Sequence, residues 1–161
     1  MPKTSKANEP VKEPLAARPG YLLRRLNQIH GSLFFEECKN FNITPVQYGM
    51  LTALSASPGL DQTALGHELG LDRTNTADVL RRLEERGLVT RHQSETDRRV
   101  KHAFNTAKGE KLTSTMYPAM QVAQERLLAP LNLQDKKKFM QLLHILIEGN
   151  NEHGRASMRA L

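Results

Sequence analysis

The chain has 161 residues, about the length of one domain, which excludes two large independent domains. Its net charge of +6 favours a polyanionic partner, although a mild basic excess is also common in proteins that bind nothing acidic. The single cysteine, Cys38, excludes an intramolecular disulfide and a cysteine-based zinc cluster, and no apolar stretch approaches a membrane span or a signal core. We therefore expect a cytoplasmic protein that does not enter a membrane.

The N-terminal part of the chain changes character at Gly20. Residues 1–19 are rich in Lys, Pro, Glu, Ser and Ala and cannot offset their ordering entropy by burial, so we expect a disordered tail. From Gly20 to about Lys39, apolar residues recur at helical spacing (Leu22, Leu26, Ile29 and Leu33). This pattern predicts a long first helix.

Capping signals predict the helices that follow. Segment 44–59 begins with the residues of a capping box and ends in a Ser-Pro-Gly turn. A short helix is expected from Asp61 to Leu69, with Gly70 in the left-handed conformation after it, and Asp72 caps the next helix. Two helices joined by such a tight turn are typical of a helix-turn-helix motif.

The helix that Asp72 opens carries polar side chains suited to DNA. A helix fits the major groove, where Arg and short polar side chains reach base edges, while basic side chains nearby neutralise phosphates. Arg81 and Arg82 either reach the DNA backbone or pair with acidic neighbours on their own helix. The residues of this helix and of the start of the preceding one that we expect to contact DNA are Gln62, Thr63, Arg73, Thr74, Asn75, Thr76, Arg81 and Arg82.

A basic hairpin follows this helix. Gly87 ends the helix, residues 88–90 begin a strand, and the run 99–104 alternates so that Arg99 and Lys101 share one face. An arginine at the hairpin tip can enter a narrow minor groove, and Asp97 would orient Arg98 and Arg99 through bidentate pairing. Alternatively, the tip is a turn whose charges only keep it soluble.

Two further helices are expected at 107–129 and 134–149, the first of them capped by Thr106. They carry more apolar surface than a small winged helix needs, so they pack against the first helix or against a second chain. We therefore predict a mainly α fold with a small β-hairpin. Its winged helix-turn-helix, 44–106, lies between the two parts of a helical dimerisation region, 20–43 and 107–161.

Taken together, these motifs resemble the MarR family of bacterial transcriptional regulators. The matching residues are LEERGLV after the second helix of the motif, Asp97 and Arg99 of a D-x-R wing, and Thr106 and Gly109 of an LT-x-x-G pattern in which Asn105 replaces leucine. The resemblance implies a homodimer with intertwined terminal helices. Its two winged helices would grip a palindromic operator about one DNA turn apart.

The first helix is similar to a branch of that family concerned with aromatic-acid catabolism. The matching segments are GYLLRRLNQIH, FFEE and ITPVQY. This similarity implies a repressor that leaves its operator when a small aromatic acid or an aromatic acyl thioester binds. The narrowest match is a repressor of nicotinate degradation that answers to a hydroxynicotinate.

An aromatic carboxylate needs an apolar slot with a cation or donor at one end. His30 lies on the apolar face of the first helix, Arg24 or Arg25 could supply the counter-charge, and Tyr48 and Tyr117 could bond a ring substituent. Each of these five residue types is also common in cores, surfaces and interfaces.

Other functions have weaker support in the sequence. No nucleophile-elbow, P-loop, zinc-protease or dinucleotide motif occurs, so we expect no enzyme, no cofactor and no metal site. A winged helix that binds an acidic protein partner remains an alternative, as does a redox-sensing regulator that acts through Cys38. Against the latter, Glu36 and Glu37 beside this cysteine do not favour a lowered thiol pKa.

Overall fold

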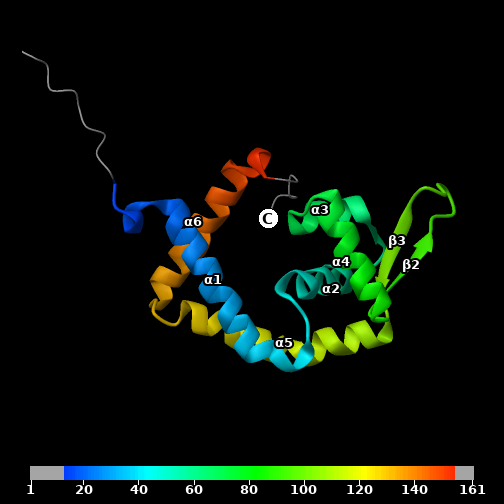
Figure 1. Cartoon of the computed structure of the whole chain (residues 1–161), viewed down its shortest axis with the longest axis horizontal. Helices are drawn as coiled ribbons and strands as arrows, with labels where there is room; N and C mark the ends of the chain where they lie inside the picture. Colours follow the sequence, from blue (N-terminus) through cyan, green and yellow to red (C-terminus); the bar gives the residue numbers. More distant parts are fainter. Residues whose placement is uncertain (1–12, 155–161) are drawn as a thin grey trace, which may run out of the picture.

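The structure, a computed structural model, describes residues 13–154 and consists of a helical arm and a winged helix (Figure 1). The arm is built from α1 (Pro19–Cys38), the C-terminal part of α5 (Ala107–Leu128) and α6 (Leu133–Gly149), and α1 packs against α5. The other elements are η1 (Leu15–Ala17), η2 (Lys39–Phe41), α2 (Pro45–Ala56), β1 (Leu60–Asp61), α3 (Gln62–Leu69), α4 (Arg73–Glu85), β2 (Val89–Gln93), β3 (Lys101–Asn105) and η3 (Asn151–His153).

The tail expected over residues 1–19 is only partly described. Residues 1–12 lie outside the described part, while Leu15–Ala17 form the short helix η1, and α1 already begins at Pro19. Proline suits the first position of α1, because an amide hydrogen there would find no acceptor within the helix and proline has none. Helical structure is therefore present from Leu15, within the segment expected to be a tail.

Side-chain caps set the helix starts as predicted. Thr44 Oγ1 accepts from the Gln47 amide at 3.2 Å, and Gln47 Oε1 accepts from the Thr44 amide at 3.1 Å, which completes the capping box of α2. The side chains of Asp72 and Thr106 likewise accept from backbone amides in the first turns of α4 and α5. Asp61, expected as the first residue of its helix, is instead the cap of α3. These four caps fix the junctions of the winged helix.

The sheet has one strand more than the predicted hairpin. Its order is β1-β3-β2, with both pairs antiparallel, and Leu60 of β1 lies opposite Ala103 of β3. The prediction that Arg99 shares a strand face with Lys101 is wrong, because β3 begins only at Lys101 and Arg99 lies in the turn. There, the Asp97 carboxylate accepts from the Arg99 amide at 2.9 Å and stabilises the turn.

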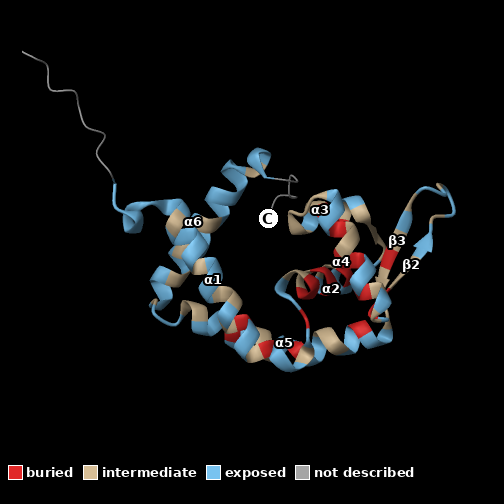
Figure 2. Ribbon diagram, in the orientation of Figure 1, coloured by how far each residue is buried: buried red, intermediate tan, exposed pale blue. Residues whose placement is uncertain are grey.

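The core lies inside the winged helix and where α5 and α1 meet it, whereas α6 has no buried residue (Figure 2). Met50, Leu51 and Leu54 of α2 and Leu80 and Leu83 of α4 are almost fully buried. Large apolar side chains of the arm remain exposed, among them Leu22, Leu23, Ile29, Leu133, Leu142, Ile145 and Leu146. Among the described residues, no helix is long and apolar enough to cross a membrane.

Candidate DNA interface

The first turn of α4 presents three of the predicted DNA-contacting side chains to solvent. Arg73, Thr74 and Asn75 are all exposed. Asp72 caps the helix by accepting from the Asn75 amide at 2.8 Å, and its second carboxylate oxygen accepts from the Asn75 side-chain amide at 2.6 Å. The cap therefore also fixes the orientation of the Asn75 side chain, whose type suits hydrogen bonds to base edges.

The prediction that Thr76 faces DNA is wrong, because Thr76 is fully buried. Its hydroxyl donates to the Asp72 carbonyl oxygen at 2.8 Å, and it lies on the same helical face as Val79 and Leu80. A Cβ atom added to Gly66 of α3 would lie 3.1 Å from Thr76 Oγ1, so the two helices approach closely here. Thr76 joins α3 to α4 and does not reach a base.

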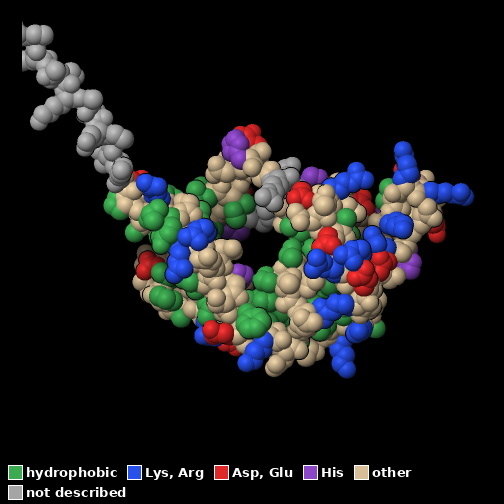
Figure 3. Space-filling model, in the orientation of Figure 1, with side chains coloured by type: hydrophobic (Ala, Val, Ile, Leu, Met, Phe, Trp, Pro, Cys, Tyr) green, Lys and Arg blue, Asp and Glu red, His purple; other side chains and the backbone are tan. Residues whose placement is uncertain are grey.

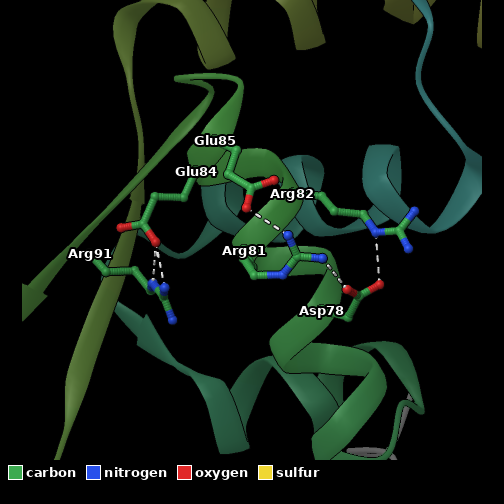
Figure 4. A network of polar contacts seen from close by, with 6 residues as sticks. All are labelled: Asp78, Arg81, Arg82, Glu84, Glu85 and Arg91. Carbon is green, nitrogen blue, oxygen red and sulfur yellow. Dashed lines mark hydrogen bonds and ion pairs between the residues drawn. The ribbon is translucent and has the colours of Figure 1, made fainter.

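Arg81 and Arg82 form ion pairs with acidic side chains of their own helix (Figure 4). Of the two predicted alternatives, contact with the DNA backbone or pairing within the helix, the structure has the second. Arg81 bridges Asp78 Oδ1 at 2.7 Å and Glu85 Oε1 at 2.6 Å, while Arg82 Nε lies 2.8 Å from Asp78 Oδ2. The hydrogen bond from Arg81 is the main cause that lowers the pKa of Asp78. A DNA phosphate must therefore compete with these carboxylates for either arginine.

The wing tip holds Arg99 as predicted. Arg99 donates to Asp97 through Nε at 3.2 Å and through a terminal nitrogen at 3.1 Å, yet its side chain is 90% exposed. The hydrogen bond from the Arg99 side chain is the main cause that lowers the pKa of the Asp97 carboxyl. Arg98 is exposed too, and its carbonyl oxygen accepts from the Gln93 side chain at 2.6 Å. Asp97 therefore orients Arg99, with no corresponding bond to Arg98.

A basic hollow of about 290 Å³ lies between the helix-turn-helix and the wing. Its wall includes predicted residues from three elements, and Gln62 Nε2 donates to the Arg73 carbonyl oxygen at 3.0 Å. Lys and Arg side chains are spread over the winged helix and its wing tip on the face shown in Figure 3. The polar residues of the wall whose side-chain types suit contacts with DNA are Gln62, Thr63, Arg73, Arg91, Arg99 and Lys101.

Arg91 in this hollow was missed by the sequence analysis. It lies on β2, is partly buried, and pairs with Glu84 of α4 through Nε at 3.0 Å and through a terminal nitrogen (Figure 4). Both nitrogens donate to the same oxygen, Glu84 Oε2, and the pair ties α4 to β2 of the wing. The available signal was an arginine on the strand that follows an acidic helix end, too common a pattern to single out.

The cations proposed for an effector site lie on the exposed face of α1. Arg24 places its guanidinium carbon 5.5 Å from the centre of the Tyr21 ring, and Arg25 donates to the Gln28 side chain at 3.1 Å. Both arginines are exposed. Either remains available to a carboxylate, at the cost of these weak local contacts.

The remaining effector candidates differ in burial. The half-buried His30 ring lies 6.4 Å from the Phe34 ring, whereas Tyr48 is buried, which raises its pKa. Tyr117 is 49% exposed, and its hydroxyl accepts from the Gln121 side chain at 2.8 Å. Only Tyr48 belongs to the core, so His30 and Tyr117 are the more accessible ring-bearing candidates.

Cys38 is buried among apolar residues of the core. Burial raises the pKa of its thiol, and the neighbouring Glu37 raises it further. A thiol that stays protonated is a poor nucleophile. These surroundings oppose the redox-sensing alternative.

The sequence and the fold are similar to those of known proteins. The MarR family matches residues 43–101, and the transcriptional regulator HosA of Escherichia coli is 32% identical over 121 residues, 75% of this chain and 88% of HosA. The PcaV regulator of Streptomyces coelicolor, solved with its natural ligand, has a TM-score of 0.81 and 33% identity and covers 84% of this chain and 96% of its own. The repressor CouR of Rhodococcus jostii, solved on a 23-mer DNA duplex, has a TM-score of 0.77 and 28% identity and covers 82% of this chain and 94% of its own. With the winged helix, the oriented wing arginine and these relatives in agreement, this chain belongs to the MarR family of transcriptional regulators.

Proposed function

We propose that this protein is a transcriptional repressor that binds a palindromic operator as a homodimer and is released by a small aromatic acid or an aromatic acyl thioester. The observation that carries the DNA-binding part is the exposed Arg99, which Asp97 holds at the wing tip beside the basic hollow. An oriented arginine needs little reordering to enter a minor groove. CouR, a repressor solved on DNA, supports the same role.

The exposed apolar side chains of the arm support the homodimer. Large exposed apolar patches on soluble proteins mark interaction sites, and α1 and α6 together expose many such side chains. A two-fold axis through the arm would set two winged helices side by side, as a palindrome requires.

The effector is inferred from the character of α1 and from PcaV, which was solved with its natural ligand. His30 lies beside the Phe34 ring, and Arg24 and Arg25 are exposed on the same helix, which are the group types that an aromatic carboxylate requires. A hydroxynicotinate is the first compound to test. A thermal-shift screen of aromatic acids and their CoA thioesters would identify a ligand, because a molecule that binds only the native state raises the melting temperature.

A gel-shift titration on the chain's own promoter at two salt concentrations tests the DNA-binding part. Wild-type affinity should fall steeply with salt, because phosphate contacts release counterions. Arg99→Ala should reduce the slope of log K against log salt by about 1 for each phosphate that the variant no longer neutralises. Arg126→Ala is the matched control, because Arg126 lies on the arm and pairs with Glu36 and Glu37.

Two results would contradict this part of the proposal. Absence of binding at low salt would end the repressor interpretation. Binding to an acidic protein with a shallower salt dependence, without binding to the promoter, would instead favour the protein-interaction alternative.

A further inference from the structure

The C-terminal end of α6 comes close to α3 of the helix-turn-helix (Figure 1). The Asn150 side-chain amide donates to the Leu146 carbonyl oxygen at 2.8 Å and closes α6, and η3 follows directly. The His153 amide donates to the Asn150 carbonyl oxygen at 2.9 Å. These local bonds fix η3 to the end of α6, so the direction of α6 determines where η3 lies.

A pocket of about 650 Å³ separates η3 from the helix-turn-helix. One side of it is formed by Glu152 of η3 and by Gly154, which follows η3. The other side includes Gln62 and Thr63 at the start of α3 and Arg73 at the start of α4. These three residues are among those expected to contact DNA. The end of the described chain therefore faces the proposed DNA interface.

Bound DNA would need the space in front of these residues. In a helix-turn-helix, the first helix crosses the DNA backbone while the second lies in the major groove. Gln and Thr side chains and the amides of a helix N-terminus are common partners of phosphates. A DNA backbone that reached Gln62 and Thr63 would therefore approach the Glu152 carboxylate, and two negative charges at close range repel each other.

The position of η3 is one that the chain can leave. The Glu152 side chain is 81% exposed and lies 3.6 Å from the ring of its neighbour His153. In addition, α6 has no buried residue, so its C-terminal end can move without opening the core of the winged helix. Such a lightly held segment is drawn from the least stable part of a structure.

We propose that η3 is an autoinhibitory element, which lies over the start of α3 and α4 in the free protein and moves aside when DNA binds. The inference rests on the proposed function, because it takes this face as the DNA-binding face. An intramolecular competitor lowers the apparent affinity in proportion to the fraction of molecules in which it is displaced. If η3 covers the face in about two thirds to nine tenths of the molecules, it weakens DNA binding about threefold to tenfold.

A chain that ends at Asn150 tests this inference. The deleted residues, 151–161, carry two arginines and one glutamate, so the loss of charge alone should weaken binding to DNA. We expect the opposite result in gel shifts, with binding about threefold to tenfold tighter than that of the full chain. A duplex from the chain's own promoter and a duplex of unrelated sequence should both show the gain, because the uncovered contacts are to phosphates.

A single substitution tests the inference in the full-length chain. Glu152→Gln should tighten binding about twofold to fivefold at low salt and less at high salt, because exposed charges are screened. Glu148→Gln is the matched control, since Glu148 is an exposed acid on α6 that does not line the pocket. It makes the same change in net charge and should alter the affinity less than Glu152→Gln does.

The truncated chain decides the question if circular dichroism and sedimentation show the wild-type fold and oligomeric state. If they do not, the comparison of Glu152→Gln with Glu148→Gln decides it. Equal or weaker binding by the truncated chain, or equal effects of the two substitutions, would overturn the inference and leave the proposed function intact. If neither the full chain nor the truncated chain binds DNA at low salt, the inference and the DNA-binding function fail together.

Discussion

The tightest junction between α5 and the winged helix lies at Gly109, and alanine at this position should destabilise the protein. A Cβ atom at Gly109 would lie 2.1 Å from the Leu88 carbonyl oxygen and 3.2 Å from its carbon. That oxygen accepts from the Thr106 amide at 3.0 Å, and Thr106 Oγ1 donates to the Gly87 carbonyl oxygen at 2.7 Å. The strand cannot retreat from the new methyl group without disturbing these bonds.

The expected effect follows from three contributions. Overpacking against a fixed backbone costs about 1–3 kcal/mol, and weakening one backbone hydrogen bond costs about 1 kcal/mol. Replacing a glycine within a helix returns about 1 kcal/mol. The net destabilisation of Gly109→Ala is therefore about 1–3 kcal/mol, which for a chain of this size lowers the melting temperature by roughly 2–12 °C.

Thermal and urea unfolding followed by circular dichroism would measure this effect. Gly31→Ala is the control, because its Cβ meets no atom within 4 Å and only the helix preference should change, with a slight gain in stability. A Gly109→Ala protein that melts at or above the wild-type temperature would refute the steric argument.

Two further predictions concern the interface and the thiol. Asn75→Ala should cost about 1–3 kcal/mol of discrimination at one base pair, measured on single-base operator variants, whereas Thr76→Val should keep base preference and lose about 1 kcal/mol of stability with its buried bond to Asp72. Equal relaxation of base preference in both variants would contradict this distinction. Burial, and to a smaller extent Glu37, raises the pKa of the Cys38 thiol, so Cys38 should stay protonated at neutral pH. Iodoacetamide should therefore label the native protein more slowly than the urea-unfolded protein. Equal rates would argue against a buried thiol.

Local signals in the sequence were enough to predict the helices and their starts. The predicted capping residues Thr44, Asp72 and Thr106 act within three residues of themselves, and each cap is present in the structure. Gly70 likewise has the predicted left-handed φ of 63°. A feature whose cause lies within one turn of chain is visible in a single sequence.

Features that depend on distant partners were not predictable in this way. The two residues of β1 form a strand only because Ala103 and His102 lie opposite, far along the chain. The pair between Glu84 and Arg91 likewise depends on how β2 leaves the end of α4. Neither has a local pattern that distinguishes it from an ordinary turn or charged surface.

Two residues were misplaced although the relevant spacing was present. Thr76 lies three residues before Val79 and so falls on the buried face, but its polar character suggested an outward position. For Arg99, the alternation of residues 99–104 extended the strand too far. The local bonds from Arg99 to Asp97 favour a turn there, so a side-chain cap took precedence over strand periodicity.

The bridge from Glu84 to Arg91 also sets the smallest piece of this chain that can be exchanged between relatives. A recognition helix transplanted alone would leave Arg91 partly buried opposite whatever residue the donor carries in place of Glu84. Such an unpaired charge would destabilise the contact between α4 and β2 and so loosen the wing, whatever the other side chains of the transplanted helix. Chimeric regulators built on this scaffold should therefore take α4 and the whole hairpin from one parent.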